Sequence, residues 1–168
     1  LKTRLTELET PVLKPNDVLI EIKRAGICGT DLHIWDGSYA LANYPVVTGH
    51  EFCGVVTAVG DAVKNFKVGD RVTADPNVPC NACEFCERGQ YNQCLNLEVI
   101  GVTRDGAFAR YVAAPEHVVY DIGDISFEQA ALIEPLACVA WGLKQVQVQP
   151  KDKVLIFGAG PMGSLMMQ

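Results

Sequence analysis

Short runs of β-branched and other apolar residues, bounded by turn residues, recur along about the first 125 residues. These runs occupy residues 18–23, 54–59, 108–112 and 118–120. The segment that opens the chain at Leu1 has the same strand-like character. Gly60-Asp61 and Gly69-Asp70 are typical of turns between strands. Many short strands at this spacing predict a small β barrel or sandwich.

The pattern becomes helical near Ser126, which is a plausible N-cap because acidic and amide side chains occupy the following turn. A second helix is predicted over residues 136–146. Residues 153–157 then form a continuous apolar run, which is typical of a buried strand in a parallel sheet. We therefore expect a mixed β and α/β fold, with one domain over residues 1–150 and the start of another over 151–168.

Both ends of the sequence look interrupted. The chain begins at Leu1 inside a strand-like segment rather than at a methionine, and residues 164–168 resemble the first turns of a helix. We therefore expect the sequence to be part of a longer protein.

Composition and charge narrow the class of protein. Hydrophobic residues make up 49% and charged residues 20%, as in globular, core-forming proteins. The net charge of −6 argues against a nucleic-acid-binding surface. No apolar run approaches the roughly 18 residues of a membrane span, and the N-terminus lacks the order of a secretion signal. We expect a cytoplasmic protein that binds a small molecule and neither nucleic acid nor membrane.

Four of the seven cysteines crowd into the pattern C-x2-C-x2-C-x7-C, formed by Cys80, Cys83, Cys86 and Cys94. In a chain without a secretion signal, such crowding favours metal ligation over disulfides. Four thiolates hold Zn²⁺ tetrahedrally and leave no position for a substrate. We expect a structural zinc lobe over about residues 76–97, in which metal binding substitutes for a hydrophobic core.

Two other interpretations of these cysteines stay open. The thiols could be unpaired or partly joined in disulfides. An iron–sulfur cluster is the more serious alternative, because C-x2-C-x2-C also opens the bacterial ferredoxin motif. That motif continues with x3-C-P, whereas here seven residues precede Cys94 and Leu95 follows it. Zinc is therefore favoured strongly.

A second set of metal-ligand types is scattered along the chain, at Cys28, His50 and Glu134. A catalytic zinc takes three protein ligands that are often far apart in sequence. Taken alone, a cysteine before a glycine is more often a small buried hydrophobe, and a lone histidine is more often a core or surface residue. Two further residues carry no metal expectation. Cys53 alternates with apolar neighbours and is expected in the core, and His117 is expected on the surface.

The order and spacing of the segments 26–31, 49–51, 80–94 and 134–136 resemble the zinc-containing medium-chain dehydrogenases over essentially the whole chain. Glu134-Pro135-Leu136 is similar to the sorbitol, polyol and threonine dehydrogenase branch rather than to the ethanol dehydrogenases. The resemblance implies a GroES-like, β-rich catalytic domain followed by the start of a Rossmann dinucleotide-binding domain.

In that branch the resemblance implies a catalytic zinc bound by Cys28, His50 and Glu134, the last directly or through water. Glu51 would be a neighbouring carboxylate that can approach the metal. Cys138 competes with Glu134, because ethanol dehydrogenases use a cysteine as the third ligand. The family's third ligand aligns with Glu134 when the distance is counted back from the glycine loop, so Cys138 is expected in the core.

The resemblance also gives roles to polar residues next to Cys28. Thr30 resembles the hydroxyl that receives the substrate's proton, and His33 resembles the exit of a proton relay through the cofactor ribose. Asp31 resembles the carboxylate that orients the zinc-bound His50. The alternative interpretations without a catalytic role are a partly exposed helix histidine for His33 and a charge at a helix N-terminus for Asp31.

A G-x-G-x-x-G sequence follows the apolar run at 153–157 and precedes an apparent helix, which is the context that a dinucleotide-binding loop requires. Its glycines allow a tight turn and a close approach of the backbone to pyrophosphate. The resemblance implies NAD as the commoner cofactor, with NADP left open. The expected cofactor-binding residues are Gly158, Gly160, Pro161, Met162 and Gly163.

Together these features imply a zinc-dependent enzyme that oxidises a secondary alcohol to a ketone with NAD(P), with two zinc ions per full-length chain. A polyol is the first choice of substrate, and L-threonine 3-dehydrogenase or another zinc alcohol dehydrogenase is the alternative. A non-catalytic zinc or iron–sulfur module is an alternative from a different class, as is a regulatory relative. The family is usually dimeric or tetrameric, and we expect residues 1–168 alone to be inactive.

Overall fold

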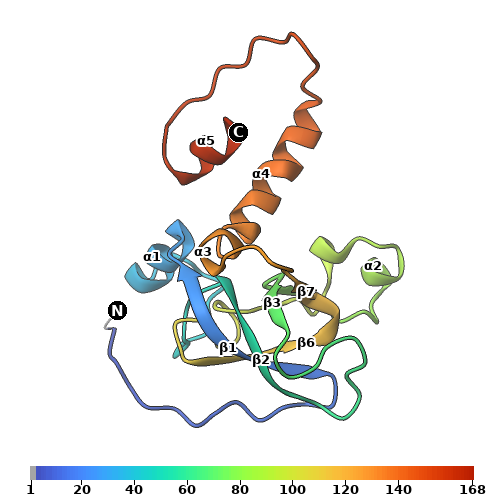
Figure 1. Cartoon of the computed structure of the whole chain (residues 1–168). Helices are drawn as coiled ribbons and strands as arrows, with labels where there is room; N and C mark the ends of the chain where they lie inside the picture. Colours follow the sequence, from blue (N-terminus) through green and yellow to red (C-terminus); the bar gives the residue numbers. More distant parts are fainter. Residues whose placement is uncertain (1–2) are drawn as a thin grey trace.

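The computed structural model describes residues 3–168 and contains a curved antiparallel sheet with helices gathered mainly at one of its ends (Figure 1). The sheet has the strand order β6-β1-β2-β3-β7. Its strands are β1 (Asp17–Gly26), β2 (Glu51–Val59), β3 (Arg71–Ala74), β6 (Tyr111–Pro115) and β7 (Val119–Asp121). A separate two-stranded ladder pairs β4 (Asn77–Val78) with β5 (Glu98–Val99).

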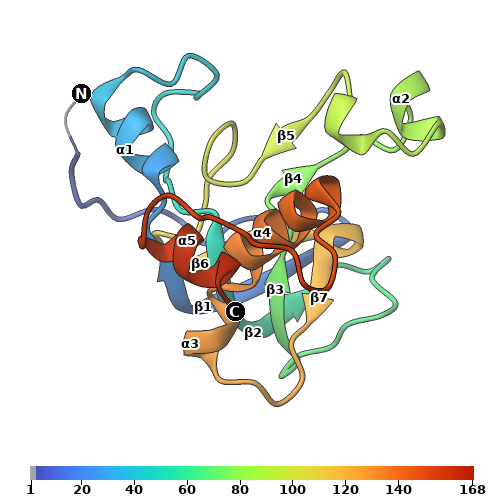
Figure 2. The same cartoon turned by 90° about the horizontal axis from the view of Figure 1, so that it is seen from above.

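The helices are short except for one. The α-helices are α1 (Gly29–Asp36), α2 (Glu84–Glu87), α3 (Phe127–Ala130), α4 (Ile133–Val146) and α5 (Pro161–Met166). The 3₁₀ turns are η1 (Tyr91–Gln93) and η2 (Glu116–Val118). In both views α4 lies between α1 on one side and α2 on the other (Figures 1 and 2). No helix within residues 3–168 is both long enough and apolar enough to cross a membrane.

The core is built from side chains of neighbouring strands and explains why these residues form strands. Val18 and Ile20 of β1 are fully buried, as are Val56 of β2 and Val72 of β3. Val112 of β6 packs into the same cluster. β-branched side chains suit this pleated, buried surface. The β-rich fold expected from the sequence is therefore confirmed.

The strands predicted at residues 18–23 and 54–59 are confirmed inside β1 and β2, and the run at 118–120 overlaps β7. The strand predicted at 108–112 is wrong over its first half, because β6 begins only at Tyr111. The backbone N–H of Phe108 instead donates to the carbonyl of Thr48. This bond draws the segment toward the loop that carries His50.

The two helix predictions are confirmed. Ser126 caps α3, since its hydroxyl accepts from the backbone N–H of Gln129 while the Gln129 side chain accepts from the backbone of Ser126. The helix predicted over residues 136–146 begins earlier, at Ile133. Pro135 lies in its first turn, where backbone N–H groups have no partner within the helix and proline is tolerated.

Two strand predictions are wrong. Residues 3–14 and residues 153–157 have no regular secondary structure. Leu155 is 76% exposed and Phe157 is 91% exposed, and no strand within the described residues pairs with this run. A strand is stabilised by hydrogen bonds to a neighbouring strand, so apolar sequence alone does not form one. The division of the chain at residue 150 into two domains stays a prediction.

Candidate metal centres

The four clustered cysteines converge in the lobe around α2. Their sulfur atoms all lie within 4.8 Å of one another, and no disulfide joins any cysteine. The Sγ atoms of Cys83 and Cys86 are 3.5 Å apart, and those of Cys80 and Cys86 are 4.0 Å apart. Zn–S bonds of about 2.3 Å in a tetrahedron place sulfurs about 3.8 Å apart. The donor set and its spacing therefore fit a closed zinc site.

The pKa values of these thiols also fit a metal site. The backbone N–H of Ala82 and the thiol of Cys94 lower the pKa of Cys80 to about 6. Burial, together with the neighbouring thiols of Cys83 and Cys94, raises the pKa of Cys86 to about 12. Like charges this close cannot all form without a compensating cation. A divalent metal ion supplies that compensation.

A second group forms where α1 and β2 begin. Cys28 is the N-cap of α1, and His50 and Glu51 lie at the entry to β2. One possible ligand atom from each of the three residues lies within 4.8 Å of those from the other two. His50 is buried, whereas Cys28 and Glu51 are partly exposed. A thiolate, an imidazole and a carboxylate are ligand types that zinc accepts.

Asp31 ties this second group together. Its Oδ2 accepts from the backbone N–H of Cys28 at 2.8 Å, and its Oδ1 accepts from that of Gly49 at 3.1 Å. The same Oδ1 lies 3.6 Å from Nδ1 of His50, an atom that is buried and has no hydrogen-bond partner closer than this. Since Nδ1 faces Asp31, Nε2 is the nitrogen left for a metal. The ring orientation thus fits the expected zinc site.

Charges around His50 are strongly coupled. Burial acts to lower the pKa of His50, but the Asp31 carboxylate and the Cys28 thiol outweigh it and raise the value to about 9. Burial acts to raise the pKa of Asp31, but the neighbouring His50 imidazole and a hydrogen bond from the backbone of Cys28 lower it. Metal binding requires neutral imidazole, so a metal ion entering this group would displace a proton.

Glu134 lies at the start of α4 and is not part of the group formed by Cys28, His50 and Glu51. It lies close enough to His50 and Glu51 for their charges to affect its pKa. Burial and the Glu51 carboxylate raise the pKa of Glu134, against the opposing influence of His50. Cys138, one turn later, lies with its Sγ 3.8 Å from Oε1 of Glu134. Cys138 is exposed, so its expected place in the core is wrong.

The other residues near Cys28 are partly brought together. Oγ1 of Thr30 lies 3.7 Å from Sγ of Cys28. The side chain of His33 is 63% exposed, and its Nδ1 lies 3.1 Å from Oγ of Ser38. Two plain expectations are confirmed as well, because Cys53 is fully buried and His117 is exposed.

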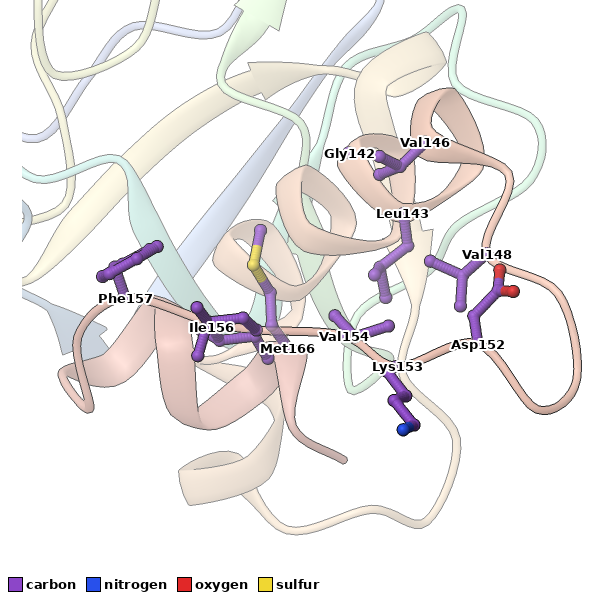
Figure 3. A pocket seen from close by; sticks show the side chains of 11 residues that line it. Gly142, Leu143, Val146, Val148, Asp152, Lys153, Val154, Ile156, Phe157 and Met166 are labelled. Carbon is purple, nitrogen blue, oxygen red and sulfur yellow. The ribbon is translucent and has the colours of Figure 1, made fainter.

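The glycine loop contributes no residue to either metal group. Gly158 has a positive φ of 99°, and a side chain at Gly163 would overlap the carbonyl oxygen of Gly158. α5 begins directly after Gly160. Residues of α4, α5 and the segment 148–157 line an open pocket of about 630 Å³, and Leu143, Val154 and Met166 are among them (Figure 3). This pocket contains none of the expected metal ligands.

The chain is similar in sequence to known dehydrogenases. It is 37% identical to D-arabinitol dehydrogenase 1 of Uromyces fabae, over 98% of this chain and 47% of that protein. It is 39% identical to D-altritol 5-dehydrogenase of Agrobacterium fabrum, over 96% of this chain and 49% of that protein. The chain therefore spans about half the length of the curated relatives it matches.

The fold agrees with these relatives. A crystal structure of an alcohol dehydrogenase from Escherichia coli CFT073, complexed with the cofactor NADH, superposes with a TM-score of 0.86 at 39% identity. That match covers 95% of this chain and 47% of the other. Residues 14–124 match the family model described as the alcohol dehydrogenase GroES-like domain. The chain accordingly belongs to this family, the zinc-containing medium-chain dehydrogenases.

Proposed function

We propose that the whole protein is a zinc- and NAD(P)-dependent dehydrogenase that oxidises a secondary hydroxyl of a polyol to a ketone. The observation that carries this proposal is the convergence of Cys28, His50 and Glu51 on one small volume. Its support from relatives is that the two reported above are named as dehydrogenases of sugar alcohols.

Zinc held by Cys28 and His50, with Glu51 or Glu134, would supply Lewis acidity that makes a substrate hydroxyl easier to deprotonate. NAD(P) would supply the hydride acceptor. The residues of this chain orient the proposed metal ligands. Asp31 fixes the imidazole of His50 and, through two backbone N–H groups, holds the turns that carry Cys28 and His50. Such a partner usually fixes the tautomer of a ligating histidine.

Thr30 and His33 are proposed to move the proton that the hydroxyl loses. The hydroxyl of Thr30 lies beside the Cys28 thiol, on the side of the proposed metal centre. His33 lies one turn later on α1 and reaches solvent. A short path from a partly buried hydroxyl to an exposed imidazole is the arrangement that proton release from a closed site requires.

The four-cysteine lobe is proposed to hold a second, structural zinc. Four thiolates fill the coordination sphere, so no substrate can bind there. Gly158, Gly160, Pro161, Met162 and Gly163 are proposed to contact the pyrophosphate of NAD or NADP. We also propose a cytoplasmic location and assembly into a dimer or tetramer, as the family resemblance implies.

L-Threonine 3-dehydrogenase is not favoured, because the relatives reported above are named for sugar alcohols. An assay of the full-length zinc-loaded protein with NAD⁺ or NADP⁺ separates the two activities. We expect reduced cofactor to form with D-arabinitol or another alditol, and little with L-threonine. Turnover of L-threonine without turnover of any alditol would contradict the proposed substrate class. No turnover with either would contradict the proposed reaction.

A further inference from the structure

Gly26 and Glu51 face each other across the sheet. They are directly paired residues in the antiparallel ladder of β1 and β2, and Gly26 lies two positions before Cys28. Directly paired residues in an antiparallel sheet place their side chains on the same face. The space above Gly26 is therefore the space next to the side chain of Glu51.

The glycine at position 26 is not required by backbone conformation, because its φ is not in the left-handed region. What position 26 lacks is room for a side chain. A methyl group there would overlap Oε2 of Glu51 and would lie 3.1 Å from Cβ and 3.3 Å from Cδ of the same residue. The nearest three atoms all belong to Glu51. The missing side chain thus leaves space that the Glu51 carboxylate fills.

Other glycines show that this arrangement is specific. At Gly54, a methyl group would overlap the backbone carbonyl of Glu21, so glycine there allows two strands to approach. At Gly29, a methyl group would meet no atom within 4 Å. At Gly26, the atom that overlaps most is the end of a flexible side chain. An alanine can be accepted there when the Glu51 carboxylate turns away and Cβ of Glu51 shifts by a few tenths of an ångström.

The carboxylate that would turn away is the one that lies with Cys28 and His50. We propose that Gly26 is a positioning residue of this metal centre: its missing side chain gives the Glu51 carboxylate its place beside Cys28 and His50. The proposal rests on the zinc centre of the proposed function. It assigns Gly26 a role that acts through Glu51 and not through the fold.

The test measures metal binding by the full-length protein rather than its activity. The variants are Gly26→Ala, Glu51→Ala, the double variant, and Gly29→Ala as a matched control beside Cys28. Zinc affinity is measured by competition with a chelator, and the visible spectrum of the Co²⁺-substituted protein reports the ligands of the metal. Thermal unfolding and occupancy of the four-cysteine site report the fold.

We expect Gly26→Ala to weaken metal binding at the Cys28 centre by about tenfold, as loss of an orienting or neighbouring ligand does. Glu51→Ala should weaken it as much, and the double variant no further. Both single variants should change the Co²⁺ spectrum in the same way. Gly29→Ala and the four-cysteine site should stay unchanged. Shortening the carboxylate, in Gly26→Ala with Glu51→Asp, should restore part of the affinity because it relieves the overlap.

The proposal is overturned if Gly26→Ala binds the metal as tightly as the unaltered protein. It is also overturned if the effects of Gly26→Ala and Glu51→Ala add in the double variant, or if Gly26→Ala unfolds the protein. These outcomes are independent of catalysis. A protein that oxidises no polyol but shows the coupling would refute the proposed function alone, whereas an active polyol dehydrogenase without the coupling would refute only the role of Gly26.

Discussion

Oδ1 of Asp31 lies 3.6 Å from Nδ1 of His50, and both side chains are almost completely buried. Asp31 lies in the first turn of α1, and His50 immediately precedes β2. One carboxylate therefore couples the helix that Cys28 caps to the start of the strand where His50 and Glu51 lie.

Replacing Asp31 tests this coupling. Asp31→Asn keeps an oxygen that can accept a backbone N–H but removes the charge that favours protonated His50. In the metal-free protein, the pKa of His50 should fall from about 9 toward its ordinary value, as an NMR titration of the imidazole would show. Zinc affinity at the Cys28 centre should fall by about 10- to 100-fold. An unchanged titration would mean that Asp31 does not control the imidazole.

Replacing Glu134 and Cys138 separately decides between the two candidate third ligands on α4. We expect Glu134→Gln in the full-length protein to lower polyol oxidation by about two orders of magnitude, as loss of a group at a catalytic metal does. Cys138→Ser, one turn away, should keep most of the activity and both zinc ions. Loss of zinc from Cys138→Ser with full activity in Glu134→Gln would reverse the assignment.

Removing one thiol from the four-cysteine lobe should lower the stability of the protein, because the lobe takes no direct part in catalysis. Cys83→Ser should release one zinc per chain and lower the melting temperature, because metal binding replaces a hydrophobic core there. Metal content by elemental analysis and thermal unfolding provide the two readouts. Cys53→Ala is the matched control, since Cys53 is buried but outside the lobe and should leave the zinc content unchanged. Iron in place of zinc in the unaltered protein would contradict the metal assignment.

Glu116 should make folding stability depend on pH. Its carboxylate accepts backbone N–H groups of Asn65 and Lys64, the first contributing most, and these bonds lower the pKa of Glu116 from its usual 4.5. A lowered pKa in the folded state stabilises the protein above the ordinary value, and this stabilisation is lost as pH falls through the lowered value.

Urea unfolding of the full-length protein and of Glu116→Gln measures this contribution. Near neutral pH the variant should be less stable by about 1 kcal/mol, the scale of a hydrogen bond to a charged group at a partly exposed position. In acid the difference should disappear, because both proteins then carry an uncharged side chain. Zinc loss in acid affects both equally. A difference that is independent of pH would show that the charge of Glu116 contributes nothing.

The convergence of Cys80, Cys83, Cys86 and Cys94 could be predicted from the sequence, because all four lie within one local segment. The core strands 18–23 and 54–59 were likewise predictable from their β-branched residues, and Ser126 from the capping pattern. The Cys28 centre was predictable only through family motifs. The contribution of Gly26 depends on which residues of β1 and β2 face each other, and this register cannot be read from either segment alone.

The predictions for residues 153–157, Cys138 and residues 108–112 were wrong for physical reasons that a local sequence pattern does not contain. The apolar run at 153–157 has strand propensity, but a strand also needs a neighbour, and the described residues provide none. Cys138 lies among apolar residues of α4, yet it is exposed beside Glu134. Residues four positions apart lie on the same face of a helix, whatever the character of the residues between them. The pattern of 108–112 did not reveal that Phe108 bonds to Thr48.

Zinc content is the most direct test of the central claim that Cys28 and His50 hold a catalytic metal separate from the four-cysteine lobe. Elemental analysis is made on the full-length protein and on Cys28→Ala with His50→Ala, alongside an assay of polyol oxidation. We predict two zinc ions per chain in the unaltered protein, and one in the double variant together with loss of polyol oxidation. Two zinc ions in the double variant, or one in the unaltered active protein, would contradict the account.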